Sequence, residues 1–190
     1  MTGLPVLRFE SAAEYRRWLS RHHARSRGIW LRIYKKRSSR PSITYAEAVD
    51  QSLCYGWIDG QGQKYDRESW LQKFTPRRPR SGWSRINTER AARLIESGAM
   101  APAGLKAVEA AKADGRWTAA YDSPRRATPP AEFLRALRKH KKAKTFFETL
   151  NKSNTYAIVY RLQTAKRPET RARRMKMILA MLAKGEKFHP

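Results

Sequence analysis

The sequence predicts an α+β fold: a small mixed or antiparallel sheet with helices, followed by a basic all-helical C-terminal segment. Two capping boxes, each a serine or threonine three residues before a glutamate, mark helix starts at Ser11 and Thr44. Several segments rich in β-branched and aromatic residues alternate in polarity, as strands do. After Ser84, apolar residues recur at the helical spacing of three and four.

The first part of the chain predicts a helix, a strand and a second helix. The helix that begins at Ser11 ends near the basic residues 21–23, and residues 28–34 alternate as a strand. The second helix runs from Thr44 to about residue 54. Gly56 ends it, because glycine readily adopts the left-handed conformation found just past a helix terminus.

The next segment predicts the rest of the sheet. Residues 57–59 begin a strand, residues 60–63 form a glycine-rich turn or bulge, and residues 64–66 and 69–75 form further strands. The proline-rich stretch 76–84 breaks this pattern, because proline lacks the N–H group that a strand ladder needs.

The remainder of the chain predicts helices. Prolines and charge mark residues 123–130 as a linker. We therefore expect an α+β domain at 1–122 and a basic helical segment at 123–190. The expected helices cover residues 84 or 88 to 97, 102–113, 128 onward, 141–150, 153–165 and 168–184.

The chain is strongly basic. It has 41 Lys+Arg against 16 Asp+Glu, a net charge of +25, and residues 123–190 alone hold 18 basic and 4 acidic residues. Such a surface attracts polyanions by releasing their counterions. We predict anion binding, with nucleic acid preferred over a small phosphorylated or carboxylated ligand. The alternative is that the basic side chains only cover solvated faces.

The rest of the composition narrows the class of protein. A single cysteine cannot form an internal disulfide, and this is typical of proteins in a reducing compartment. One cysteine and four scattered histidines also make a zinc site unexpected. No apolar run reaches the roughly 20 residues that cross a bilayer, and the N-terminus lacks a signal-peptide pattern. We expect a soluble, cytoplasmic protein without a cofactor or membrane span.

The stretch LCYGWIDG, residues 53–60, is the first candidate site. Glu47, Asp50 and Cys54 share one face of the preceding helix, and Asp59 follows between glycines that allow close approach of a ligand. The residues indicate either a cleft or the packing of a helix-to-strand corner. In the second case Glu47 only caps its helix, and Asp59 only pairs with an arginine.

The second candidate site combines residues 74–79 with residues 83–87. Arginine forks bind carboxylate or phosphate, a serine before a helix can seat an anion, and tryptophan can stack on a base. We predict that the arginines and Ser84 hold the anionic group, that Trp57 and Trp83 stack, and that Asp59 orients the arginines. Otherwise Ser84 is an ordinary helix cap. The predicted ligand-binding residues are Trp57, Asp59, Arg77, Arg78, Trp83, Ser84 and Asn87.

The third candidate site is a set of basic residues on the C-terminal helices. We predict that they contact a nucleic-acid backbone without reading its sequence. Their spacing is also that of ordinary solvated helix faces. The residues are Lys139, Lys141, Lys142, Arg171 and Arg174.

No standard catalytic motif occurs: there is no nucleophile elbow, phosphate-binding loop, dinucleotide fingerprint or His-Glu-x-x-His motif. A catalytic base would have to be Asp59, Glu47 or Asp50. Two alternatives to nucleic-acid binding stay open. One is a small hydrolase-like or toxin-modifying protection enzyme that uses Asp59 as its base. The other is a module that binds an acidic toxin protein.

Three blocks of the sequence, ITYAEAVDQSLCYGWIDG, KFTPRRPRSGWSRIN and MAPAGLKAVEAAKADGRW, resemble the bacterial YdeI/OmpD-associated family, also called the bacteriocin-protection or OmdA family. The resemblance covers most of residues 31–117, and residues 129–184 resemble the helical ending of that family. It implies an α+β domain and a role in stress or toxin resistance, without a mechanism. Its signature positions are Tyr45, Glu47, Ala48, Gly56, Trp57, Asp59, Gly60, Pro76, Arg77, Ser84 and Asn87.

Overall fold

The computed structural model describes residues 3–190, and the chain forms two compact units. The first unit holds the chain up to Trp83 together with Asn87–Thr118, and the second holds Ser84–Ile86 and Ala119–Pro190. A mixed sheet with helices forms the first unit, and the C-terminal region is helical. The predicted α+β class with a helical C-terminal segment is therefore confirmed.

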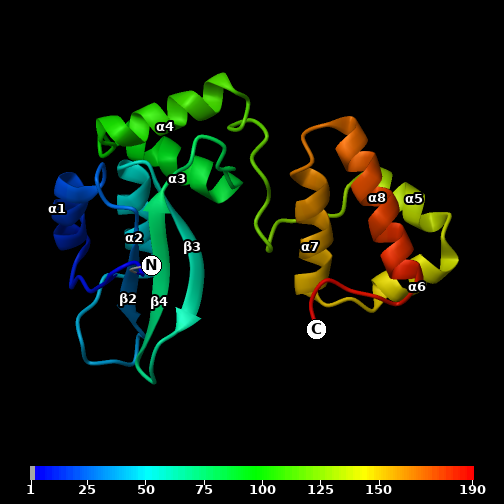
Figure 1. The fold of residues 1–190 in the computed structure, drawn as a ribbon, viewed down its shortest axis with the longest axis horizontal. Helices are drawn as coiled ribbons and strands as arrows, with labels where there is room; N and C mark the ends of the chain where they lie inside the picture. The colour runs from blue at the N-terminus through cyan, green and yellow to red at the C-terminus, as the bar shows by residue number, and fades with distance from the viewer. Residues whose placement is uncertain (1–2) are drawn as a thin grey trace. The chain divides into compact units, whose positions relative to one another are not determined.

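The sheet of the first unit has four strands in the order β1 (Val6–Leu7), β2 (Ile29–Tyr34), β4 (Ser69–Pro76) and β3 (Trp57–Lys64). Figure 1 shows β4 between β2 and β3. β1 runs parallel to β2, and the other neighbours are antiparallel. β3 continues through the segment predicted as a turn or bulge, and the structure has a bulge there, between Asp59 and Gly62. The sequence did not predict β1, because two residues are too few to show alternation.

Helices α1 (Ala12–His22) and α2 (Tyr45–Cys54) pack on one face of this sheet. The Tyr15 ring lies 6.1 Å from the ring of Phe74, and the Trp18 ring lies 5.8 Å from that of Trp57. Both helices begin at the predicted caps, where the side chains of Ser11 and Thr44 accept hydrogen bonds from backbone N–H groups. We call this the helix-covered face of the sheet.

Two further helices, α3 (Arg85–Glu96) and α4 (Pro102–Ala113), follow the sheet. α4 approaches the end of α2 very closely at Gly104, where a Cβ atom would lie 2.3 Å from the carbonyl oxygen of Cys54. Gly56 has a φ of +70°, so the chain turns from α2 into β3 through the left-handed conformation that was predicted.

The second unit contains α5 (Ala131–Arg138), α6 (Lys141–Glu148), α7 (Lys152–Gln163) and α8 (Pro168–Ala183). These helices bury a core of their own, as expected from their apolar spacing. None of the helices in the described residues is both long and apolar enough to span a bilayer. The buried core residues are Phe133, Leu137, Ala143, Ile158, Leu162, Ile178, Leu179 and Leu182.

Candidate functional site

Trp57, the first residue of β3, is a core residue. Its side chain is 1% exposed, and the indole meets Trp18 edge-on. The indole Nε1 donates a hydrogen bond of 3.2 Å to the carbonyl oxygen of His23. A ring that is packed on all sides has no face for a base, so the prediction that Trp57 stacks on a ligand does not agree with the structure.

Asp59 is held by a tyrosine and not by an arginine. The hydroxyl of Tyr45, at the start of α2, donates a 2.6 Å hydrogen bond to Oδ2 of Asp59. Asp59 pairs with Phe74 in the β3–β4 ladder, while Trp57 pairs with Pro76. Arg77 lies three residues beyond Phe74, so its backbone is about 10 Å from that of Phe74 at the spacing of residues in a strand. The prediction that Asp59 orients the arginines is corrected: Asp59 joins β3 to α2.

Arg77 and Trp83 come together as predicted, but they meet each other rather than enclose a ligand. The Arg77 guanidinium lies 3.6 Å from the centroid of the Trp83 ring, and its Nη1 donates to the carbonyl oxygen of Gly82 at 3.1 Å. Trp83 is 2% exposed and packs against Trp117 on another side. This cation–π contact closes the proline-rich loop, and the buried Trp83 ring has no face for a stacked base.

The other three residues of this predicted site have different surroundings. Arg78 is exposed, and its backbone N–H donates to Oγ of Ser81 at 3.0 Å. Ser84 directly precedes α3 and forms a parallel bridge with Tyr121 in the second unit. Asn87 is half-buried in the first turn of α3. Their role in ligand binding remains a prediction.

The residues on the α2 face have structural partners. Glu47 completes the capping box of α2, and the hydrogen bonds from the hydroxyl and backbone of Thr44 lower its pKa. Asp50 is paired with Arg90 at 2.6 Å. Burial raises the pKa of the Cys54 thiol, although Arg16 opposes the shift, so Cys54 is not activated as a nucleophile. No group of three acidic, histidine or cysteine residues in the described chain is arranged to hold a metal ion.

The predicted basic residues of the C-terminal helices fall into two groups. Lys139, Lys141 and Lys142 are exposed where α5 meets α6. Arg171 is bonded to Glu132 of α5, and Nη1 of Arg174 donates to the carbonyl oxygen of Arg161 at 2.6 Å. The two arginines thus tie α8 to neighbouring segments, whereas the three lysines project into solvent.

The helical unit also contains a hollow of about 970 Å³ beside the first turn of α7. Two cationic side chains, Arg125 and Lys152, are in its lining, and no carboxylate is. The hollow was not predicted, because its residues come from the linker and from two later segments. Its lining residues are Pro124, Arg125, Ala127, Leu150, Lys152, Ser153, Thr155 and Tyr156.

A set of aromatic and cationic residues that the sequence reasoning missed lies on the sheet face opposite α1 and α2. Trp30 pairs with Lys73 across β2 and β4, and Arg32 lies two residues from Trp30 on the same face. Tyr65 follows β3 directly, and its ring lies under the guanidinium of Arg32. We call these four residues the open sheet face. The alternation of residues 29–34, with Trp30 and Arg32 out of phase with the apolar positions, was the signal that could have found it.

Comparison with protein families gave two matches. Residues 7–107 match the family described as Domain of unknown function (DUF8412). Residues 126–185 match the family described as Bacteriocin-protection, YdeI or OmpD-Associated, which confirms the resemblance seen in the sequence and places its match in the helical segment. The three blocks that first indicated this family lie largely within the other match. Neither the curated proteins nor the solved structures gave a match.

Proposed function

The chain belongs to the family described as Domain of unknown function (DUF8412), and its residues 126–185 match the family described as Bacteriocin-protection, YdeI or OmpD-Associated. We propose that this chain binds nucleic acid through its helical unit. The binding surface is the lysine corner, which we define as residues 138–144. The family description adds a biological role, protection against bacteriocins. In this proposal the chain contributes to that role by binding a polyanion.

The observation that supports this function is the concentration of exposed cations at the lysine corner. Residues 138–144 contain five basic residues and no acidic one, and all five basic side chains are exposed. Lys144 forms a surface ion pair with Glu148 at 3.7 Å, a kind of contact that contributes little to stability. The corner therefore offers an excess of positive charge to phosphates.

The position of these lysines on α6 indicates that they do not stabilise the helix. Lys141 and Lys142 occupy the first turn of α6, where the helix dipole is positive, and no acidic residue lies in that turn. Each cation there costs the helix about 0.3–1 kcal/mol. A phosphate group at the corner would reverse this effect, because it interacts favourably with both the lysines and the helix dipole.

A salt titration with a labelled oligonucleotide tests the proposal. Because each neutralised phosphate adds about 0.9 to the slope of log K against log salt, replacing Lys139, Lys141 and Lys142 with Gln should reduce the slope for a DNA duplex by about 2–3. The matched control replaces three exposed lysines elsewhere with Gln, namely Lys106, Lys166 and Lys176. It removes the same charge but not the corner.

The two triple variants separate a defined interface from a general effect of charge. A control triple variant that weakens binding as much as the corner variant would contradict the proposed interface. An affinity that does not change between low and moderate salt would contradict binding through phosphates altogether.

A further inference from the structure

The open sheet face combines one exposed and one half-buried aromatic ring with cations. Tyr65 is 52% exposed, and Trp30 and Lys73 are half-buried. The Lys73 ammonium lies 5.8 Å from the Trp30 ring centroid, and the Arg32 guanidinium lies 4.8 Å from that of Tyr65. Helices α1 and α2 cover the other face, so these side chains are not required for that core.

We propose that the open sheet face binds single-stranded nucleic acid, with unpaired bases stacking on Tyr65 and Trp30 and the phosphates contacting the cations around them. This inference rests on the nucleic-acid binding of the proposed function, and it deepens that function by naming a second surface and the form of nucleic acid that it selects. Base–aromatic stacking tolerates any sequence, because every base has a π face.

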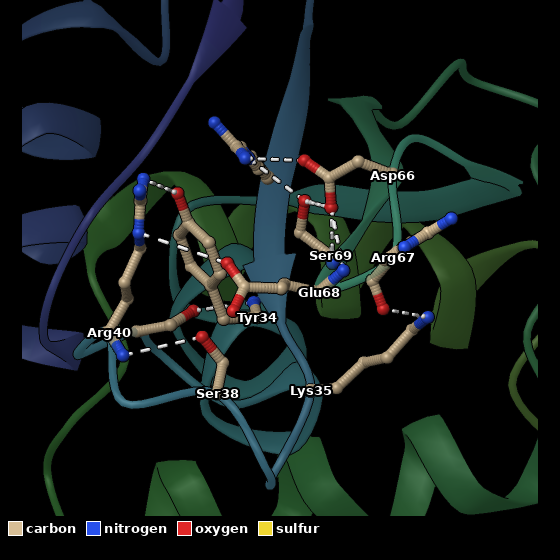
Figure 2. A network of polar contacts seen from close by, with 10 residues as sticks. Tyr34, Lys35, Ser38, Arg40, Asp66, Arg67, Glu68 and Ser69 are labelled. Carbon is tan, nitrogen blue, oxygen red and sulfur yellow. Dashed lines mark hydrogen bonds and ion pairs between the residues drawn. The ribbon is translucent and has the colours of Figure 1, made fainter.

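The Tyr65 ring is held in place before a ligand arrives. Arg32 lies between the rings of Tyr34 and Tyr65, 4.7 and 4.8 Å from their centroids. Its Nη2 donates to Oδ2 of Asp66 at 2.6 Å, and its Nε donates to Oγ of Ser69 at 2.9 Å. Figure 2 shows Asp66 and Ser69 turned toward each other at this end of the sheet. A ring that is already ordered costs less entropy to use in binding.

The charge around the rings matches a phosphate backbone. Residues 30–40 and 64–73 together contain eight basic and two acidic residues. Both carboxylates have cationic partners. Asp66 is paired with Arg32, and the Glu68 carboxylate lies 3.9 Å from the Arg40 guanidinium. Figure 2 shows the pair of Glu68 and Arg40. The remaining basic side chains give the region an excess of positive charge. Those that are exposed include Lys36, Arg37, Lys64 and Arg67.

The combination of rings and cations selects single strands over other polyanions. In a duplex the faces of the bases are covered by their neighbours, so a duplex can use the cations but not the rings. An acidic polypeptide also matches the charge, but it does not offer a flat base to Tyr65 and Trp30. The single strand is the partner that uses both features.

Anisotropy of labelled oligo-dT and of a duplex of equal length tests this inference on the full chain. We expect Tyr65→Ser to weaken oligo-dT binding about ten-fold and to leave duplex binding unchanged, because stacking on one base is lost. Tyr65→Phe keeps the ring and should bind like the unchanged protein. Since Tyr65 is exposed, neither change should disturb folding, which far-ultraviolet circular dichroism checks.

The outcomes separate this inference from the proposed function. If Tyr65→Ser has no effect while the lysine-corner variant weakens binding, the sheet proposal is overturned and the proposed function stands. If only Tyr65→Ser weakens binding, the sheet proposal stands and the lysine-corner interface fails. If neither oligo-dT nor the duplex binds at low salt, both proposals are overturned, whereas failure of oligo-dT alone overturns only the sheet proposal. Polyglutamate that displaces oligo-dT at equal charge overturns stacking, because the face would then select charge alone.

Discussion

At the scale of single residues, Asp66 organises the end of the sheet beside the open face. Its Oδ1 accepts hydrogen bonds from the Ser69 hydroxyl at 2.8 Å and from the backbone N–H groups of Ser69 and Glu68 at 2.7 and 2.9 Å. These hydrogen bonds lower the pKa of Asp66 below its usual value of 3.8, and the bond from the Ser69 hydroxyl has the largest effect. The nearby Arg32 lowers the pKa further. All of them favour the ionised carboxylate over the neutral acid.

This shift predicts an acid-sensitive contribution to stability. Because the pKa of Asp66 is lower in the folded chain than in the unfolded one, its contribution is full above the unfolded value of 3.8 and is lost as the pH falls through the folded value. Asp66→Asn should therefore unfold at a lower urea concentration than the unchanged protein at pH 6, and the difference should shrink as the pH falls below 3.8. Glu109→Gln, at an exposed position of α4, is the control. A difference that is constant with pH would contradict the assignment.

Composition and spacing predicted the helices and strands better than they predicted which of the candidate site residues are exposed. The sequence grouped Trp57 and Trp83 with the ligand-binding residues, yet both are buried. A tryptophan in a strand or loop has the same pattern whether its ring packs inward or faces solvent, because the burial depends on helices that come from distant parts of the chain. The half-buried Trp30 was visible only as one position of an alternating strand.

At the scale of elements, prediction worked where a local signal fixed the structure. Two caps and the left-handed Gly56 are local, and α1, α2 and the turn after α2 formed as predicted. α4 has the predicted bounds, 102–113. The bulge in β3 was not distinguished from a turn, because glycines at 60 and 62 suit both, and only the pairing with β4 decides.

The close approach of α4 to α2 predicts an unusual sign for one substitution. In an exposed helix, Gly→Ala stabilises by about 1 kcal/mol. At Gly104 the new Cβ would lie 2.3 Å from the backbone oxygen of Cys54, which cannot move without shifting α2. We therefore expect Gly104→Ala to destabilise the protein by about 1–3 kcal/mol, measured by urea unfolding. Ala110→Gly, at an exposed position of the same helix, should cost about 1 kcal/mol from propensity alone. Stabilisation by Gly104→Ala would show that the two helices do not meet as described.

At the scale of the whole molecule, the chain builds two separate hydrophobic cores. The sheet and α1 and α2 bury one, around Phe74, Leu31 and Tyr15, and α5–α8 bury the other, around Leu162 and Ile178. The proposed surfaces follow this division, with the open sheet face in the first unit and the lysine corner in the second.

The distribution of tryptophan allows the two cores to be followed separately. All six tryptophans lie in the first unit, whereas the far-ultraviolet circular dichroism signal reports helices of both. Leu162→Ala removes a fully buried side chain from the helical core and should destabilise it by about 2–5 kcal/mol. We expect the circular dichroism transition to broaden and part of it to move to lower urea, while the tryptophan fluorescence transition stays in place. Leu31→Ala, an equally buried position of β2, should do the reverse and move the fluorescence transition. If Leu162→Ala moved both signals together, the two cores would unfold as one cooperative unit, and a variant of the lysine corner could then no longer be assumed to leave the open sheet face unchanged.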